Sequence, residues 1–497
     1  MTHGTAVQDA AAPGTPAAGG LSVRTRVFYG LGEAGEGLKT AALETFLFFY
    51  YVQVVGLSGA LTGLALFVAL LFDGVSDPFV GAWSDRLRSR LGRRHPFLYA
   101  APVPLAIALW FLFQPPEFGQ WGLFAWLTAL TIAARFAMTL YFVPHMALGA
   151  ELSRDFAERV SVGGYRVLFG YVGRIIALGL AFSVFFADRP GFENGQLDPA
   201  AYPPFALATG ALVVFFVIVS ALGTQRAALA LQKEDAGAAP PSHDGLVRKL
   251  RLAVGSPSFR ALFFALLVMY LYNGVQFALA LHMNTYFWEL PPQSVQLVFY
   301  ASMAGYIIGI PLARPAAGRL DKKAAYMAGI AGSCVMGSAP TLLRLAGLAP
   351  ENGEAGVLPL LIGCSFMAGL IGCIPVVLSS AMLADVADEY DLTHGGRAEG
   401  LFFGANAFCR KVSLGLGGAV AGVVIDLIRF PANTAPGAVP LDALTRLGVV
   451  YGPVMLSVLF LGLAIMIPYN MGRARHAAIV AELRRRDTAQ APTRPPP

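Results

Sequence analysis

Residues 60–96 read ALTGLALFVALLFDGVSDPFVGAWSDRLRSRLGRRHP, an apolar run that contains two aspartates and ends in a loop of arginines. About 20 consecutive apolar residues are enough to span a bilayer, so the run up to Trp83 is long enough to cross one. Asp73 and Asp77 lie inside this run, four residues apart, and therefore share one face of a helix. The stretch predicts a membrane-spanning helix with a polar face, followed by an arginine-rich loop.

The same pattern extends over the whole chain of 497 residues, of which 56% are hydrophobic and 13% charged. Soluble domains carry about 25% charged residues, so this composition excludes a soluble enzyme. The formal net charge is +6, but the basic residues lie in short loops between apolar runs. We therefore expect the chain to contact a lipid bilayer and to have no nucleic-acid partner.

Twelve apolar spans fall into two sets of six, which predicts an all-α membrane protein built from two six-helix halves. The expected parts are a disordered tail (1–20), an N-terminal half (21–223), a cytoplasmic linker (224–258), a C-terminal half (259–472) and a cytoplasmic tail (473–497). Loops rich in Lys and Arg stay in the cytoplasm, and here they follow spans two, four and eight. We expect an integral protein of the plasma (inner) membrane with both termini cytoplasmic.

Several stretches of the chain resemble a known class of transporters. Residues 81–96 resemble the signature loop of the major facilitator superfamily, and other stretches resemble its glycoside–pentoside–hexuronide:cation symporter family. These stretches are Tyr29-Gly-Leu-Gly, Val54 to Ser58 with Phe72 to Pro78, Val143 to Leu152 and Met382 to Tyr390. The resemblance implies the major facilitator fold and cation-coupled transport by alternating access.

The resemblance also assigns a cation site to Asp73, Asp77 and Thr139. A charged carboxylate inside a bilayer costs about 2.5–3.5 kcal/mol, and a bound Na⁺ or a proton would neutralise the pair. The alternative is that Asp77, near the cytoplasmic side, only pairs with an arginine of the following loop. Apart from this coupling ion, Na⁺ or H⁺, we expect no metal and no cofactor.

Span one carries a polar stripe on an otherwise apolar helix. Its members recur at steps of three and four residues and are Glu33, Glu36, Thr40 and Glu44. This spacing predicts one helix face turned toward a central cavity, with Lys39 close enough to neutralise Glu36 in part. Whether Glu33 faces that cavity or reaches the cytoplasmic interface stays open.

Basic residues inside other spans complete the expected solute site. Arg166 and Lys411 match basic positions of the family, whereas its other sugar-binding positions, two aspartates and a tryptophan, fall here at Gly37, Phe142 and Met146. The expected solute-binding residues are Glu36, Glu44, Phe142, Met146, Arg166 and Lys411. For Arg135 and Arg174 a solute role and a structural ion pair stay open, and His145 is either a proton relay or a packing residue.

The loop after span two also suggests a gate. Asp85 with Arg86, Arg93 and Arg94 is expected to latch the two halves together in the outward-open state.

Three functions remain to be compared. The first is a symporter for a sugar or glycoside, and the second is the same fold carrying an amphipathic or anionic solute, such as a lysolipid or a glycoconjugate, which Phe142 and Met146 would suit. The third is a membrane-embedded enzyme, but the chain has no nucleophile elbow and no His/Glu helix motif. We expect a transporter that works as a monomer and binds a small-molecule solute.

Overall fold

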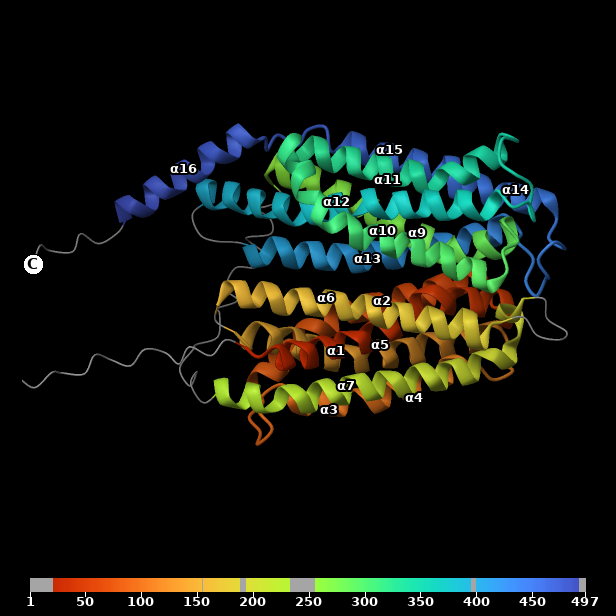
Figure 1. Ribbon diagram of the computed structural model, residues 1–497, viewed down its shortest axis with the longest axis horizontal. Helices are drawn as coiled ribbons and strands as arrows, with labels where there is room; N and C mark the ends of the chain where they lie inside the picture. The colour runs from red at the N-terminus through yellow and green to blue at the C-terminus, as the bar shows by residue number, and fades with distance from the viewer. Residues whose placement is uncertain (1–20, 154, 188–193, 233–254, 395–398, 491–497) are drawn as a thin grey trace, which may run out of the picture.

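The computed structural model describes residues 21–153, 155–187, 194–232, 255–394 and 399–490. The expected tail at residues 1–20, most of the expected linker and the last residues of the chain lie outside the described residues. The described residues form helices and no strand. They pack as two helical bundles, one from each half of the chain, that lie side by side along their length (Figure 1).

The N-terminal bundle holds the first six spans. They are α1 (Val23–Ala41) continued by π-helical turns to Val55, α2 (Gly59–Arg86), α3 (His95–Ala100) with α4 (Pro102–Leu112), α5 (Gln120–Glu151), α6 (Phe156–Gly179) with a π-helical turn to Phe185, and α7 (Tyr202–Gln232). Helices begin where the sequence supplies capping oxygens: Ser58 Oγ accepts from the Leu61 amide, and Asp155 Oδ1 accepts from the Glu158 amide. Helix α7 continues nine residues beyond the expected end of the half at residue 223.

The C-terminal bundle holds the other six spans and one additional helix. The spans are α9 (Pro257–His282) with a π-helical turn to Phe287, α10 (Pro292–Arg319), α11 (Lys322–Leu345), α12 (Val357–His394), α13 (Glu399–Leu427), and α14 (Leu441–Val449) joined to α15 (Met455–Ile465). The additional helix is α16 (Arg473–Gln490), within the segment expected to be a tail. It packs against the end of α12, where Arg475 Nη2 lies 2.6 Å from Glu389 Oε1.

Eleven of the described helical segments are long and apolar enough to cross a membrane. The remaining span is the first, which is long enough but carries Glu33, Glu36 and Lys39 within α1. It packs between α6 and α7, so much of its surface is covered by protein. A polar helix shielded in this way completes the expected set of twelve spans.

Small residues allow the two bundles to approach closely along α2 and α13. Gly59 of α2 lies against Gly422 of α13, and neither position has room for a Cβ because each would meet the other's backbone carbonyl. Within the C-terminal bundle, Gly305 and Gly309 of α10 press in the same way on the backbone of α12. These contacts make α2–α13 the main junction between the halves.

The molecule has two different ends. The start of α1, the loop Leu87–Arg94 and helix α16 lie at one end, which we call the basic end (Figure 1). The opposite end carries the loops around Gly56, Phe113 and Pro431. Both described ends of the chain therefore lie on the side that carries the arginine-rich loop.

Candidate functional site

A cluster of charged side chains lies where α2, α5 and α13 meet. Asp73 Oδ1 accepts from Thr139 Oγ1 at 2.9 Å, and Asp73 Oδ2 lies 3.4 Å from Arg135 Nη1 and 3.1 Å from Lys411 Nζ. Asp77 Oδ1 lies 3.0 Å from Thr139 Oγ1, and Asp77 Oδ2 forms an ion pair with Lys411 Nζ. The four-residue steps from Asp73 to Asp77 and from Arg135 to Thr139 bring the two helix faces into register.

The formal charges of this cluster cancel. Two carboxylates face two cations, and one of the cations, Lys411, comes from the other half of the chain. Lys411 Nζ contacts both carboxylates at once, which is the position that a bound cation would need. Since ionised groups are costly in a membrane, mutual neutralisation is what allows all four to lie there.

The structure brings the expected cation-site residues together and places two basic side chains, Arg135 and Lys411, against them. Asp73, Asp77 and Thr139 meet as expected, and Asp77 pairs with Lys411 rather than with an arginine of the following loop. Lys411, expected at the solute site, lies in this cluster instead. Arg135 is a structural ion-pair partner here, which was one of the two roles left open for it.

The stripe on the first span lies apart from this cluster. Glu36 Oε1 accepts from Thr40 Oγ1 at 2.5 Å and from Lys39 Nζ at 3.1 Å, so its partners come from its own helix. About two turns beyond Glu36, Glu44 Oε2 lies 4.0 Å from Arg174 Nη1 of α6, with both side chains about half exposed. Glu44 of the stripe and its partner Arg174 of α6 are therefore the side chains here that are most open to a solute.

The other expected solute residues lie between α5 and α6. The Arg166 guanidinium of α6 contacts the sulfur of Met146, which is 38% exposed, and Phe142 lies one turn away on α5. No ion pair joins Arg166 to Glu36 among the described residues. This pairing of a guanidinium with an apolar surface would suit a solute that has both polar and apolar faces.

The expected gate forms its contacts inside the N-terminal half. Arg94 Nη2 lies 2.6 Å from both Asp85 Oδ1 and Glu151 Oε1, and its Nη1 donates to Ser84 Oγ at 2.6 Å. Arg93 Nη2 lies 3.5 Å from Glu151 Oε1. Among the described residues, no ion pair joins Asp85, Arg86, Arg93 or Arg94 to the C-terminal half. In this state Asp85, Arg93 and Arg94 connect α2 to the end of α5.

The junction between the halves at the opposite end was missed by the sequence reasoning. Asp426 of α13 accepts from the first amides of α2, with Oδ1 at 2.9 Å from Gly59 N and Oδ2 at 2.9 Å from Ala60 N. Ser58 Oγ also donates to Asp426 Oδ2 at 2.6 Å. A carboxylate isolated near the end of an apolar run was the available signal.

A second set of contacts strengthens this closed end. Tyr286 of the C-terminal half donates to Gln53 Oε1 at 3.1 Å, and Gln53 O accepts from the Asn433 amide at 3.0 Å. On the basic side of Asp77 and Lys411, no hydrogen bond or ion pair joins the described residues of the two halves. The halves are therefore joined at mid-depth and at the opposite end.

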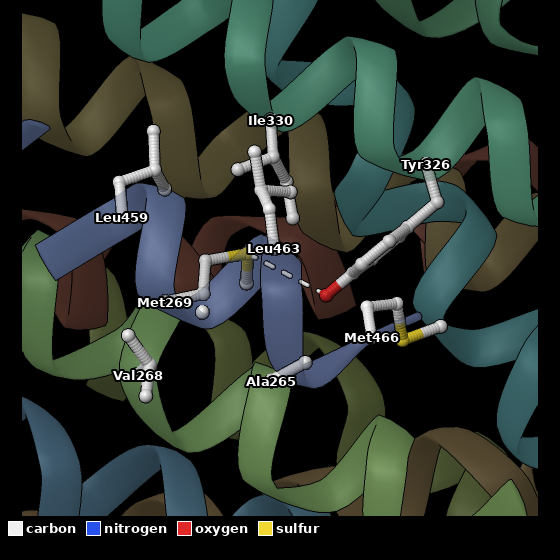
Figure 2. A pocket seen from close by; sticks show the side chains of 9 residues that line it. Ala265, Val268, Met269, Tyr326, Ile330, Leu459, Leu463 and Met466 are labelled. Atoms are coloured by element: carbon white, nitrogen blue, oxygen red, sulfur yellow. Dashed lines mark hydrogen bonds between the residues drawn. The ribbon is translucent and has the colours of Figure 1, made fainter. Parts of the chain in front are cut away.

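A small pocket in the C-terminal half is unrelated to these sites. It lies between α9, α11 and α15, and Figure 2 shows its apolar lining, with the Tyr326 hydroxyl directed at Met269. That hydroxyl is 3.8 Å from Met269 Sδ. No charged side chain lines the pocket, and its one hydroxyl is directed at Met269, so it is not a candidate site for a charged solute.

The whole pattern matches a family model described as MFS/sugar transport protein, over residues 28–473. The chain belongs to this family. It is 25% identical to the putative glycoside/cation symporter YagG of Escherichia coli (strain K12), over 95% of this chain and 96% of that protein. It is also 25% identical to the sphingosine-1-phosphate transporter MFSD2B of Mus musculus, over 90% of this chain and 89% of that protein.

The fold also matches that of solved transporters. The inward-open xylose transporter XylE from E. coli aligns with a TM-score of 0.61 at 12% identity, covering 92% of this chain and 98% of that one. The expected major facilitator fold is thereby confirmed. The family and the fold together confirm that the chain is an integral membrane transporter and not an enzyme.

Proposed function

We propose that this transporter is a symporter that couples the uptake of a sugar- or glycoside-like solute to a cation bound at Asp73 and Asp77. The observation that carries the proposal is the contact of Lys411 Nζ with both carboxylates. A Na⁺ or a proton that neutralises the pair competes with this ammonium. Cation binding would thus release α13 from α2 at mid-depth and change the contact between the two halves.

The arrangement of the junctions supports a state open toward the basic end. Described contacts join the halves at the opposite end and at mid-depth but not beyond. With the arginine-rich loop on the cytoplasmic side, both termini are cytoplasmic and this state faces inward. Alternating access then requires the Asp426 contacts to break before solute enters from outside.

The solute itself would bind between α1, α5 and α6. Glu36, Glu44 and Arg174 offer charged groups on one side, and Arg166, Met146 and Phe142 offer a cation beside an apolar surface. Hydroxyls and carboxylates would find partners there. The glycoside named for the relative YagG supports a sugar-like solute.

A second candidate solute is an amphipathic phosphate or other anionic lipid. The contact between Arg166 and the half-exposed Met146 favours it, as does the similarity to a sphingosine-1-phosphate transporter. In this case Arg166 would bind the anionic head and Met146 the adjoining chain. The protein would remain a monomeric, cation-coupled carrier.

Counterflow in proteoliposomes tests the proposal and separates the two solutes. Proteoliposomes that contain the purified protein would be loaded in turn with each member of a panel of glycosides, hexuronates and lysophospholipids. Each solute would be tested with an imposed Na⁺ gradient, an imposed proton gradient or neither. Uphill uptake of a glycoside driven by one of the gradients is expected. Exchange of lysolipids alone would favour the second solute, and exchange that no gradient drives uphill would overturn cation coupling.

A further inference from the structure

Outside the cation cluster, a second pair of titratable groups is buried in the N-terminal half. Glu33 Oε2 of α1 lies 3.9 Å from His145 Nδ1 of α5. Neither atom has a hydrogen-bond partner among the described residues, although both are buried. His145 is fully buried, and its ring lies between those of Tyr29 and Tyr141, at centroid distances of 4.3 and 4.9 Å.

The hydrogen bonding of the imidazole decides what Nδ1 can do. The other ring nitrogen, Nε2, lies 3.0 Å from the backbone carbonyl oxygen of Tyr29. A carbonyl only accepts hydrogen bonds, so Nε2 carries a hydrogen, and Nδ1 of a neutral imidazole presents a lone pair. An ionised Glu33 and a neutral His145 would therefore face each other as two acceptors with no donor between them.

One additional proton resolves this conflict. We propose that Glu33 and His145 form a proton-binding site, in which the Glu33 carboxyl holds the proton and directs it at Nδ1 of a neutral His145. The neutral pair is favoured over a carboxylate–imidazolium pair because two charges at a buried position lose more solvation than a neutral hydrogen bond does.

Charged and titratable groups from several helices act on this site. They are Tyr29, Glu36 and Lys39 of α1, His95 of α3, Tyr141 of α5, and Arg166 and Arg174 of α6. Glu36 already pairs with Lys39 and accepts from Thr40, so its charge is not available to balance the charges of both Arg166 and Arg174. A movement of α6 that brings Arg166 or Arg174 toward Glu33 would favour the carboxylate and expel the proton.

The site therefore links protonation to the helix that is expected to bind the solute. Gly170 of α6 lies directly against Glu33, because a Cβ there would be 3.2 Å from Glu33 Cγ. The proton site exists independently of Asp73 and Asp77. Its part in transport, however, rests on the proposed symport.

Infrared difference spectroscopy of the full-length protein in detergent tests the site directly. The parent should show a protonated-carboxyl C=O band at neutral pH that is lost in Glu33→Gln. The same band should persist in Glu44→Gln, which changes the half-exposed glutamate of the same span, and in Asp77→Asn. Identical carboxyl bands in the parent and Glu33→Gln would overturn the proton site while leaving the coupling role of Asp77 untouched.

A second variant keeps the test usable if Glu33→Gln does not fold. His145→Phe preserves a ring between Tyr29 and Tyr141 but removes the acceptor Nδ1. The Glu33 carboxyl then loses its acceptor, so its C=O band should move to higher frequency. An unshifted band would show that Glu33 does not donate to His145 and would overturn the pair.

Discussion

Helices α2 and α13 meet at two junctions that neutralise charge in opposite ways. At mid-depth α2 supplies the carboxylates of Asp73 and Asp77, and α13 supplies the ammonium of Lys411. At the opposite end α13 supplies the carboxylate of Asp426, and α2 supplies backbone amides. The proposed symport requires the first junction to exchange its cation, whereas the second joins a carboxylate to backbone amides, which a soluble cation cannot replace.

This difference separates two tasks of a carrier. If Asp73 and Asp77 bind the coupling ion as proposed, the ammonium at mid-depth competes with that ion, and this junction would respond to an ion gradient. The amides at the start of α2 are the unpaired donors of a helix N-terminus, and a carboxylate there is favoured by the helix dipole as well. Those contacts break when the two halves separate, which suits a seal at one end of the molecule.

The largest effect is expected at the exchangeable junction. Asp77→Asn keeps the size of the side chain but removes a charge that both Lys411 and a coupling cation need. Uphill accumulation in proteoliposomes should fall to the equilibrium level, while exchange of solute continues in part. Asp85→Asn, which neutralises an exposed carboxylate near the arginine-rich loop, serves as the control. Normal gradient-driven accumulation by Asp77→Asn would show that Asp77 has no part in coupling.

The next prediction concerns the ammonium itself. Lys411→Gln leaves Asp77 without a cation and Asp73 with Arg135 alone. Breaking a fully buried ion pair costs about 3–5 kcal/mol, and the partly exposed Lys411–Asp77 pair should lose less than that. The variant should melt at a lower temperature than the parent. Since a ligand that binds only the folded state restores about 2.7 kcal/mol at 100 times its Kd, added Na⁺ or a lower pH should recover most of the loss.

The charge-retaining variant Lys411→Arg provides the comparison for this experiment. Its melting temperature should depend little on Na⁺ or pH, because a cation still contacts the carboxylates. If Lys411→Gln responds to neither Na⁺ nor protons, the ammonium does not occupy a cation site and the exchange between them is wrong.

The two junctions also differ in how far they could be predicted from the sequence. The twelve spans and the facing of Asp73, Asp77 and Thr139 follow from hydropathy, helical periodicity and family resemblance. The basic partner of the two aspartates could not be predicted from the sequence, because any basic side chain within the spans could neutralise them. Only the crossing of α2 and α13 selects Lys411, more than 330 residues further along the chain.

The seal was harder to predict for a different reason. Asp426 binds backbone amides, which every helix start presents, so no side-chain pattern identifies its partner. For the expected gate the sequence suggested the ion pair itself but not which parts of the chain it connects. Asp85 and Arg94 do form an ion pair, but Glu151 and Ser84 hold Arg94 within the same half, which loop composition alone does not reveal.

A moderate effect is expected at the seal. Asp426→Ala removes the acceptor of two amides and a hydroxyl, and loss of a helix cap costs about 0.5–2 kcal/mol. The population with separated halves at this end should rise by up to about 30-fold. Spin labels at Trp121 and Leu441, both exposed at this end, would report the distance, in a background whose native cysteines are replaced.

Graded variants sharpen this measurement. Ser58→Ala removes the hydroxyl that donates to Asp426 and caps the Leu61 amide but keeps both amide contacts of Asp426, so it should shift the distances less than Asp426→Ala. Unchanged distances in Asp426→Ala would mean that the contacts of Gln53 with Tyr286 and Asn433 close this end on their own.

The smallest effect is expected at the gate of the basic end. Asp85 is 61% exposed, and its partner Arg94 is 6% exposed and keeps Glu151 and Ser84 when Asp85 is reversed to Lys. An exposed ion pair contributes about 0–1 kcal/mol, so Asp85→Lys should change the distance between the spin labels at Trp121 and Leu441 only slightly. Arg94→Gln should instead lower the melting temperature, because it removes a buried cation that connects α2 to α5. A large change of this distance in Asp85→Lys would mean that Asp85 also contacts the C-terminal half when the end opposite the basic end opens, which is the latch first expected from the loop.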